Sequence, residues 1–396
     1  MSVEQVRRKM RTVGRVLHGT AAAILTAVLA VTLAPQPAQA AIAVIGTVYK
    51  EPQPYEARFP DIIKLDDGNL MAVWHRAELH VGTVEKPANG TIQLSIWNGT
   101  VWSAPVLALA HPRFLGDVDM RDPKLAKMND GQVIMTYFVG AKLYYSYWRE
   151  GWTRFTDPLQ LTMPGAPASM ASHGSVLPLQ QGGNPTDQVL VPFYSSGTEG
   201  GAFYLRATYH PNQTERLEPT FVKRIIKNDN PVGRRYTEPS FVQIGEKIVA
   251  GIRSENKVDG NDELQARPLA IGRWDAHDDT TNPTFELFQL GAGNPVLASS
   301  HHLLKTVKNG QEKIFFTYGN RFTPTRRPTY GIMIDNPLAT WTGTSRLLYD
   351  SGAYDQANPS SVEAAEGWYW TLAFNANPGS TDNGRLLMVR SLHTDY

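Results

Sequence analysis

Hydrophobic runs in this chain come in pairs, and a short polar turn separates the two runs of each pair. The clearest example covers residues 236–253, where two apolar runs flank residues 245–247. A connection of two to three residues between apolar runs predicts a β-hairpin, because so tight a turn can join antiparallel strands. A hairpin here places Glu238 and Arg253 at the same end of two adjacent strands.

The same hairpin pattern recurs along the chain. From the first copy at Arg58 to the last at Asn358 the chain runs 300 residues over five intervals, so the mean period is 60 residues. In a β-rich chain such a long period is typical of propeller blades or of tandem sandwiches. We therefore predict an all-β protein, a six-bladed β-propeller. The blades are expected near residues 42–105, 106–160, 161–222, 223–288, 289–345 and 346–396, with residues 42–50 as the missing outer strand of the last blade.

The composition favours strands and excludes several kinds of site. The chain has 33 glycines and 27 prolines among many β-branched and aromatic residues, which favours short strands and turns over helices. It has no cysteine, so disulfides, thiolate metal sites and a cysteine nucleophile are excluded. A formal net charge of +1 argues against general binding of nucleic acid or of an anionic membrane. We expect neither a metal ion nor a cofactor.

The first forty residues have the pattern of a secretory signal peptide. Basic residues lie between positions 7 and 15, an apolar run covers residues 21–33, and Ala38-Gln39-Ala40 precedes Ala41. The apolar run is shorter than the ~20 residues that cross a bilayer, which favours cleavage after Ala40 over a retained membrane anchor. We expect residues 1–40 to be removed, and residues 41–396 to form one secreted, monomeric domain without membrane contact.

The propeller interpretation predicts which residues meet at the centre. In a propeller, the innermost strand of each blade starts at one mouth of the central channel. Polar side chains occupy this position in most of the repeats, and gathering them is costly unless they pair or meet a ligand. We therefore predict a binding or catalytic cleft on the axis, with a water-filled, ion-paired channel as the alternative. The residues in this register are Arg58 or its neighbour Phe59, Asp122, His173, Glu238, His301 and Asn358.

Three segments end in a turn followed by tryptophan, namely residues 95–102, 146–152 and 334–341. They resemble the Asp-box, or BNR repeat, of the sialidase superfamily, whose pattern Ser-x-Asp-x-Gly-x-x-Trp closes the outer hairpin of a blade. In the first two segments Trp97 and Trp148 stand in place of the Asp. The resemblance implies a sialidase-like propeller of six blades.

A second set of residues resembles the site motifs of the same superfamily. Arg58-Phe-Pro is similar to its Arg-x-Pro motif, Glu238 with Arg253 to its Glu and Arg pair, and Arg321 to its third arginine. This resemblance implies a secreted exo-acting glycosidase that removes sialic acid or a related acidic sugar from glycan ends. The three arginines would clamp the sugar carboxylate, because a guanidinium fork binds a carboxylate at two points. His173 and His301 are further candidate substrate-binding residues.

The resemblance also implies that Glu238 acts as base for a tyrosine nucleophile, and here the chain departs from the superfamily. The register places Asn358 where that tyrosine belongs, and the nearest tyrosine, Tyr354, lies four residues earlier. No aspartate lies between Asp67 and Asp117 to serve as the acid/base residue. The candidates for that role are Glu78, Glu85 and Asp122.

Three other functions stay open. Asp122 and Glu238 would be the acid and base of an ordinary two-carboxylate glycosidase, and their separation would decide between retention and inversion. A polysaccharide lyase would use an arginine to neutralise a uronate, and a histidine or tyrosine to remove the C5 proton. A glycan-binding propeller would carry out no chemistry. The arginines also have structural alternatives as ion pairs: Arg58 with Asp61, Arg253 with Glu238 or Glu255, and Arg321 with Asp335.

Overall fold

The computed structural model describes residues 42–80, 89–109, 119–196, 199–229, 233–257, 264–290, 295–321, 325–353, 356, 358–377 and 383–396. Residues 42–396 form one compact unit. The expected signal peptide and its cleavage site after Ala40 lie outside the described residues. Within the described ranges, no helix is long and apolar enough to cross a membrane.

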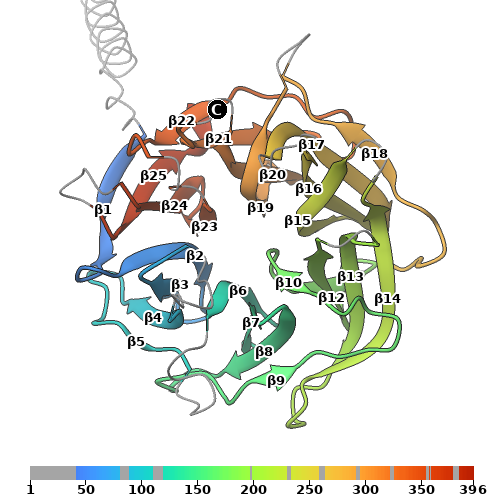
Figure 1. Ribbon diagram of the computed structural model, residues 1–396, viewed down its shortest axis with the longest axis horizontal. Helices are drawn as coiled ribbons and strands as arrows, with labels where there is room; N and C mark the ends of the chain where they lie inside the picture. Colours follow the sequence, from blue (N-terminus) through green and yellow to red (C-terminus); the bar gives the residue numbers. More distant parts are fainter. Residues whose placement is uncertain are drawn as a thin grey trace, which may run out of the picture. The chain divides into compact units, whose positions relative to one another are not determined.

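The described residues form six antiparallel sheets that lie in a ring (Figure 1). In five sheets the first strands along the chain lie next to the axis and the last lies at the rim; in the sixth, β23 lies next to the axis and β1 lies at the rim. This arrangement confirms the predicted all-β, six-bladed propeller. The short 3-10 helix η2 (His393–Asp395) follows the final strand.

The first three blades follow one another along the chain. Blade 1 contains β2 (Glu56–Lys64), β3 (Leu70–Ala77), β4 (Thr91–Trp97) and β5 (Val106–Leu107). Blade 2 contains β6 (Met120–Lys127), β7 (Val133–Val139), β8 (Lys142–Trp148) and β9 (Leu159–Gln160). Blade 3 has its innermost strand split in two, and contains β10 (Ala171–Ser172), β11 (Leu177–Gln181), β12 (Asn184–Ser195), β13 (Gly201–Tyr209) and β14 (Leu217–Lys227).

The last three blades complete the ring. Blade 4 contains β15 (Arg234–Ile244), β16 (Lys247–Lys257), β17 (Leu264–Asp275) and β18 (Thr284–Leu287). Blade 5 contains β19 (Ala298–Lys308), β20 (Gln311–Asn320), β21 (Thr329–Ile334) and β22 (Arg346–Tyr349). Blade 6 contains β23 (Ser360–Ala365), β24 (Trp368–Asn375), β25 (Arg385–Leu392) and β1 (Ala43–Lys50).

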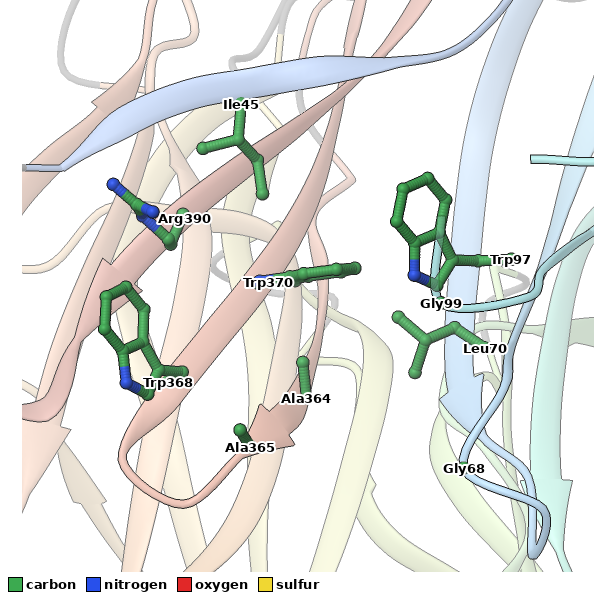
Figure 2. A pocket seen from close by; sticks show the side chains of 10 residues that line it. All are labelled: Ile45, Gly68, Leu70, Trp97, Gly99, Ala364, Ala365, Trp368, Trp370 and Arg390. Carbon is green, nitrogen blue, oxygen red and sulfur yellow. The ribbon is translucent and has the colours of Figure 1, made fainter. Parts of the chain in front are cut away.

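The ring closes through the N-terminal strand, as the sequence predicts for residues 42–50. β1 pairs antiparallel with β25, with Ala43 opposite Arg390 and Lys50 opposite Arg385. Blade 6 is therefore made from both ends of the compact unit. At its contact with blade 1, the indoles of Trp97 and Trp370 lie 5.7 Å apart between ring centroids (Figure 2).

The predicted blade boundaries are displaced at three outer strands. β5, the second part of β14, and β22 each lie beyond the boundary expected for their own blade. These strands are short or largely exposed, so their sequences lack the paired apolar runs on which the boundaries were placed.

Apolar side chains are buried between neighbouring blades. In the described part of the chain, one buried apolar cluster lies at each of the six contacts between blades. Trp74 and Phe374 fill the contact of blades 1 and 6, and Phe316 and Trp341 belong to that of blades 4 and 5. Because burial of apolar surface drives packing between the blades, the axis is left to polar side chains.

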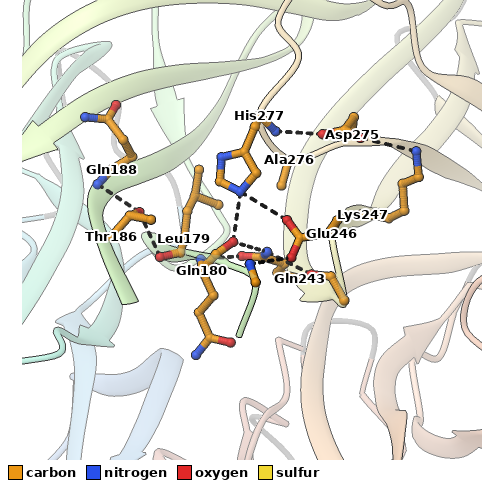
Figure 3. A network of polar contacts seen from close by, with 12 residues as sticks. Leu179, Gln180, Thr186, Gln188, Gln243, Glu246, Lys247, Asp275, Ala276 and His277 are labelled. Atoms are coloured by element: carbon orange, nitrogen blue, oxygen red, sulfur yellow. Dashed lines mark hydrogen bonds and ion pairs between the residues drawn. The ribbon is translucent and has the colours of Figure 1, made fainter. Parts of the chain in front are cut away.

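A polar contact joins blades 3 and 4 near the turns of their inner hairpins (Figure 3). The amide of Gln243 accepts a hydrogen bond from the backbone N–H of Gln180 at 2.8 Å and donates to its carbonyl at 2.6 Å. The His277 ring nitrogen Nε2 donates to the same carbonyl at 2.8 Å. Gln243 is 5% exposed, and the N–H of Gln180 depends on its side chain, whereas the Gln180 carbonyl has His277 as a second donor.

Replacing Gln243 with Ala should lower the free energy of unfolding by about 1–3 kcal/mol, because the backbone groups of Gln180 would lose a buried partner. Urea unfolding would measure the change. The exposed Gln181, to which the structure assigns no side-chain hydrogen bond, is the matched control, and Gln181→Ala should stay within about 0.5 kcal/mol of the unaltered protein. Equal losses in the two variants would show that the Gln243 contact does not hold the blades together.

Candidate active site

Inner strands of this propeller carry a bulge that turns one residue toward the axis. The pairing of β2 with β3, β6 with β7, β15 with β16, and β19 with β20 shifts register at the same relative place. The residue inside each shift has a positive φ of 48–54°. Such a backbone is costly for residues other than glycine and concentrates at functional sites. These residues are Phe59, Asp122, Glu238 and Ser300.

These four residues line one central cavity of about 340 Å³. Asn358, which also has a positive φ, lines the cavity from blade 6. Of the expected axis residues, the structure thus brings Asp122, Glu238 and Asn358 together, with Phe59 as the inward residue of blade 1. The described residues that line it are Phe59, His80, Arg121, Asp122, Phe138, Tyr194, Glu238, Arg253, Ser300, Arg321, Arg327 and Asn358.

Glu238 is a buried carboxylate held by charged and neutral donors. Arg253 Nη1 donates to Glu238 Oε1 at 2.5 Å, and the Ser300 backbone N–H donates to Oε2 at 2.7 Å. Burial opposes ionisation, but the Arg253 guanidinium and the other positive neighbours outweigh it and hold the pKa of Glu238 well below its usual range. Glu238 is therefore an ionised group at any pH at which an enzyme works.

Asp122 has the opposite protonation state. Its Oδ1 is buried without a hydrogen-bond partner. Burial, opposed by Lys124 and assisted by the charge of Glu238, raises the pKa of Asp122 to about 7. One cavity thus contains a carboxylic acid that keeps its proton up to neutral pH and a carboxylate that does not. A pair of carboxyl groups with separated pKa values is the arrangement that acid and base catalysis requires.

Glu255 fixes two guanidinium groups beside this pair. Arg253 Nη2 donates to Glu255 Oε2 at 2.7 Å, and Arg321 Nη1 donates to the same oxygen at 3.1 Å. Glu255 is 3% exposed. Two of the three predicted clamp arginines therefore meet at one point, and Arg121 and Arg327 also line the cavity.

Arg58 does not take its predicted place in the clamp. It forms an ion pair with Glu56 and is absent from the cavity lining, because the bulge turns the next residue, Phe59, toward the axis. Arg253 pairs with both of its suggested partners, Glu238 and Glu255, whereas the partners suggested for Arg58 and Arg321 are wrong. Asp61 accepts the backbone N–H of Leu125. Asp335 pairs with Lys313, while Arg321 pairs with Glu255.

His173 and His301 lie behind the cavity and not in its lining. His173 Nε2 donates to the carbonyl of His301 at 3.1 Å, and His301 Nε2 donates to that of Gly251 at 2.8 Å. Burial lowers the pKa of His173 to about 3 and that of His301 to about 4, so both rings are neutral; His173 links blade 3 to blade 5, and His301 links blade 5 to blade 4. Ser300 takes the inward position in blade 5 because the bulge falls one residue earlier than predicted.

The predicted tyrosine nucleophile, Tyr354, lies outside the described residues. Tyr194 does line the cavity, but burial raises its pKa, and the charges of Asp122 and Glu238 add to the rise. Of the glutamates considered as acid/base residues, Glu85 is also outside the described ranges, and Glu78 is not in the lining. Asp122 is therefore the candidate acid that the structure places in the cavity.

Several lining residues were missed by the sequence analysis. Arg121 could have been found, since Arg121-Asp-Pro repeats the pattern of Arg58-Phe-Pro. His80 and Arg327 lie in connections that follow strands and share no repeated pattern. Across the described ranges, no group of three or more His, Asp or Glu residues is arranged to hold a metal ion.

Comparison with known proteins identifies similarity at the level of the fold. No family model matches the sequence, and no curated protein matches it significantly. A protein of unknown function from Dyadobacter fermentans superposes with a TM-score of 0.66, at 16% identity over 89% of this chain and 99% of that one. The NanB sialidase of Streptococcus pneumoniae gives 0.62, at 10% identity over 92% of this chain and 72% of that one.

A third solved structure is the GH93 α-L-arabinofuranosidase of Fusarium graminearum with arabinobiose. It gives a TM-score of 0.62, at 10% identity over 89% of this chain and 99% of that one. At these identities the likeness shows a shared fold. Residues 42–396 have the sialidase-like six-bladed propeller fold, which confirms the predicted resemblance at the level of the fold, and these named neighbours include glycoside hydrolases.

Proposed function

We propose that this protein is a secreted glycoside hydrolase whose central cavity holds the terminal sugar of a glycan. The observation that carries the proposal is the pair of carboxyl groups in one cavity, Asp122 protonated and Glu238 ionised. Structural likeness to glycosidases of two specificities supports the reaction class and leaves the sugar open. Secretion rests on the N-terminal pattern, and recovery from the culture medium of a chain beginning at Ala41 tests it.

In this mechanism Asp122 is the general acid. Its proton goes to the glycosidic oxygen as the bond to the anomeric carbon breaks, so the leaving sugar departs as an alcohol. Glu238 faces the developing positive charge as a carboxylate, which either attacks the anomeric carbon or removes a proton from an attacking water. Arg253 keeps Glu238 ionised, and the Ser300 N–H fixes its second oxygen.

We further propose that the terminal sugar is acidic. The cavity is lined by four guanidinium groups, from Arg121, Arg253, Arg321 and Arg327. Arg253 and Arg321 each donate one nitrogen to the same oxygen of Glu255, so this carboxylate holds two guanidinium groups side by side in the cavity lining, where both can attract a sugar carboxylate. A protonated Asp122 leaves this side of the cavity with less negative charge to repel the sugar carboxylate.

A substrate panel tests both parts of the proposal. The mature protein is incubated with 4-methylumbelliferyl glycosides of N-acetylneuraminic acid, glucuronic acid and L-arabinofuranose, and separately with polygalacturonate. We expect fluorescence from an acidic glycoside. Fluorescence from the arabinofuranoside alone would contradict the proposal that the terminal sugar is acidic, but it would still support glycoside hydrolysis. An ultraviolet-absorbing unsaturated product would identify a lyase. Binding without any product would identify a glycan-binding protein.

A further inference from the structure

A second cavity, of about 430 Å³, lies where blades 1 and 6 meet (Figure 2). Three indoles and one guanidinium line it, from Trp97, Trp368, Trp370 and Arg390; these four residues define the aromatic cavity. Trp97 and Trp370 meet edge to face, at 5.7 Å between centroids and 78° between planes. Arg390 Cζ lies 4.9 Å from the centroid of Trp368. The four side chains come from β4, β24 and β25 of two different blades.

The aromatic cavity is separate from the central cavity, and the two have no lining residue in common. β2 begins near Phe59, which lines the central cavity, and runs to the turn at Gly68, which lines the aromatic cavity. In the same way, Asn358 precedes β23, whereas Ala364 and Ala365 end it. At about 3.3 Å per strand residue, the two cavities lie at opposite ends of the inner strands, on opposite faces of the ring.

Trp97 packs against Trp102 and Trp370 at the contact of blades 1 and 6, and it also lines the aromatic cavity. It stands where the Asp-box pattern has Asp, as Trp148 does in the second segment. Trp148 is 3% exposed and its indole N–H donates to the carbonyl of Trp152 at 2.7 Å, so it belongs to the core. Trp97 is half-buried and turned to the aromatic cavity. In the first segment the residue at the Asp position therefore forms part of the wall of an open cavity.

The polar groups of the aromatic cavity are unpaired. Within the described part of the chain, the indole N–H groups of Trp97, Trp368 and Trp370 donate to no protein acceptor and are not buried, so they can donate to a molecule in the cavity. Arg390 makes no ion pair with a described carboxylate, and its Nε is buried without a hydrogen-bond partner. A buried donor such as Arg390 Nε is costly without a partner, and the exposed indole N–H groups offer further donors to the oxygen atoms of a ligand.

We propose that the aromatic cavity is a second glycan site that binds an acidic sugar unit of a polysaccharide. A sugar ring offers an apolar face to the indoles and hydroxyl oxygens to their N–H groups. A carboxylate on that sugar pairs with Arg390, and none of the described residues that line the aromatic cavity carries a carboxylate to compete for the guanidinium. This site holds the polymer on the face opposite the central cavity and does not depend on the chemistry proposed there.

Affinity electrophoresis in native gels containing polygalacturonate tests this site. The mature protein should be retarded, and Trp370→Ala and Arg390→Gln should each weaken the binding about tenfold, as expected for loss of an indole contact or of a charged pair. Trp152→Ala is the matched control, because Trp152 is 41% exposed and lies in blade 2. Gels containing dextran, a neutral polymer, should retard none of these proteins.

Activity and assembly measurements separate the alternatives. Trp370→Ala should leave turnover of a small fluorogenic glycoside unchanged, since the aromatic cavity does not touch the central cavity. Polygalacturonate binding that survives both Trp370→Ala and Arg390→Gln, or no retardation of the unaltered protein, would overturn the proposal. If sedimentation shows an oligomer that Trp370→Ala dissociates, the aromatic cavity is an interface between copies of the chain, which also overturns it.

Discussion

Replacing Glu238 with Gln is expected to lower kcat on the best substrate of the panel by about two to four orders of magnitude. Gln preserves the shape of the side chain and can still accept the Ser300 N–H, but it carries no negative charge for the anomeric carbon or for an attacking water. Arg253 keeps its second carboxylate, Glu255, so the cavity should not collapse. Steady-state kinetics on the purified variant give the change.

Two comparisons make this result specific. Glu218→Gln, whose side chain is 69% exposed and pairs with His210, should retain full activity. The melting temperature of Glu238→Gln should lie within a few degrees of that of the unaltered protein. Full activity in Glu238→Gln would show that Glu238 is not required for catalysis. If Tyr354→Phe abolishes activity while Asp122→Asn does not, the tyrosine mechanism implied by the superfamily resemblance is the correct one.

Asp122→Asn should have the second large effect, and it should change the pH profile as well as the rate. Because the acid acts only while protonated, kcat/KM of the unaltered enzyme should fall about tenfold per pH unit above the pKa of Asp122, which is about 7. Asn cannot donate a proton in this way, so activity should fall about 10²–10⁴-fold and the alkaline decline should disappear. A pH series of kcat/KM for both proteins measures the two effects.

The same substitution should affect stability with a definite sign. The pKa of Asp122 is raised from an unfolded value near 3.8 to about 7, so the folded state loses stability as pH rises between these two values. Asn removes this loss. The melting temperature of Asp122→Asn should therefore exceed that of the unaltered protein by roughly 2–5 °C at pH 8 and match it near pH 4. A variant less stable at pH 8, or an alkaline decline that survives the substitution, would contradict the assignment of Asp122.

The sequence by itself determined the blade repeat and the pairing of Glu238 with Arg253. Both are local: a turn of two or three residues between apolar runs decides that two strands pair, and the register follows, with Thr237 opposite Arg253. The closing strand could also be predicted, because residues 42–50 are an apolar run with no hairpin partner nearby, while the last blade lacked an outer strand.

Only the tertiary structure decided which residues face the axis and what charge they carry. A bulge of one residue selects Phe59 over Arg58 and Ser300 over His301, and nothing in the apolar pattern marks its position. Glu238 receives the Ser300 N–H from the next blade. Burial raises the pKa of Asp122, and burial is a sum over neighbours far apart in the chain. These interactions depend on distances in space, which a hairpin pattern with a period of about sixty residues does not encode.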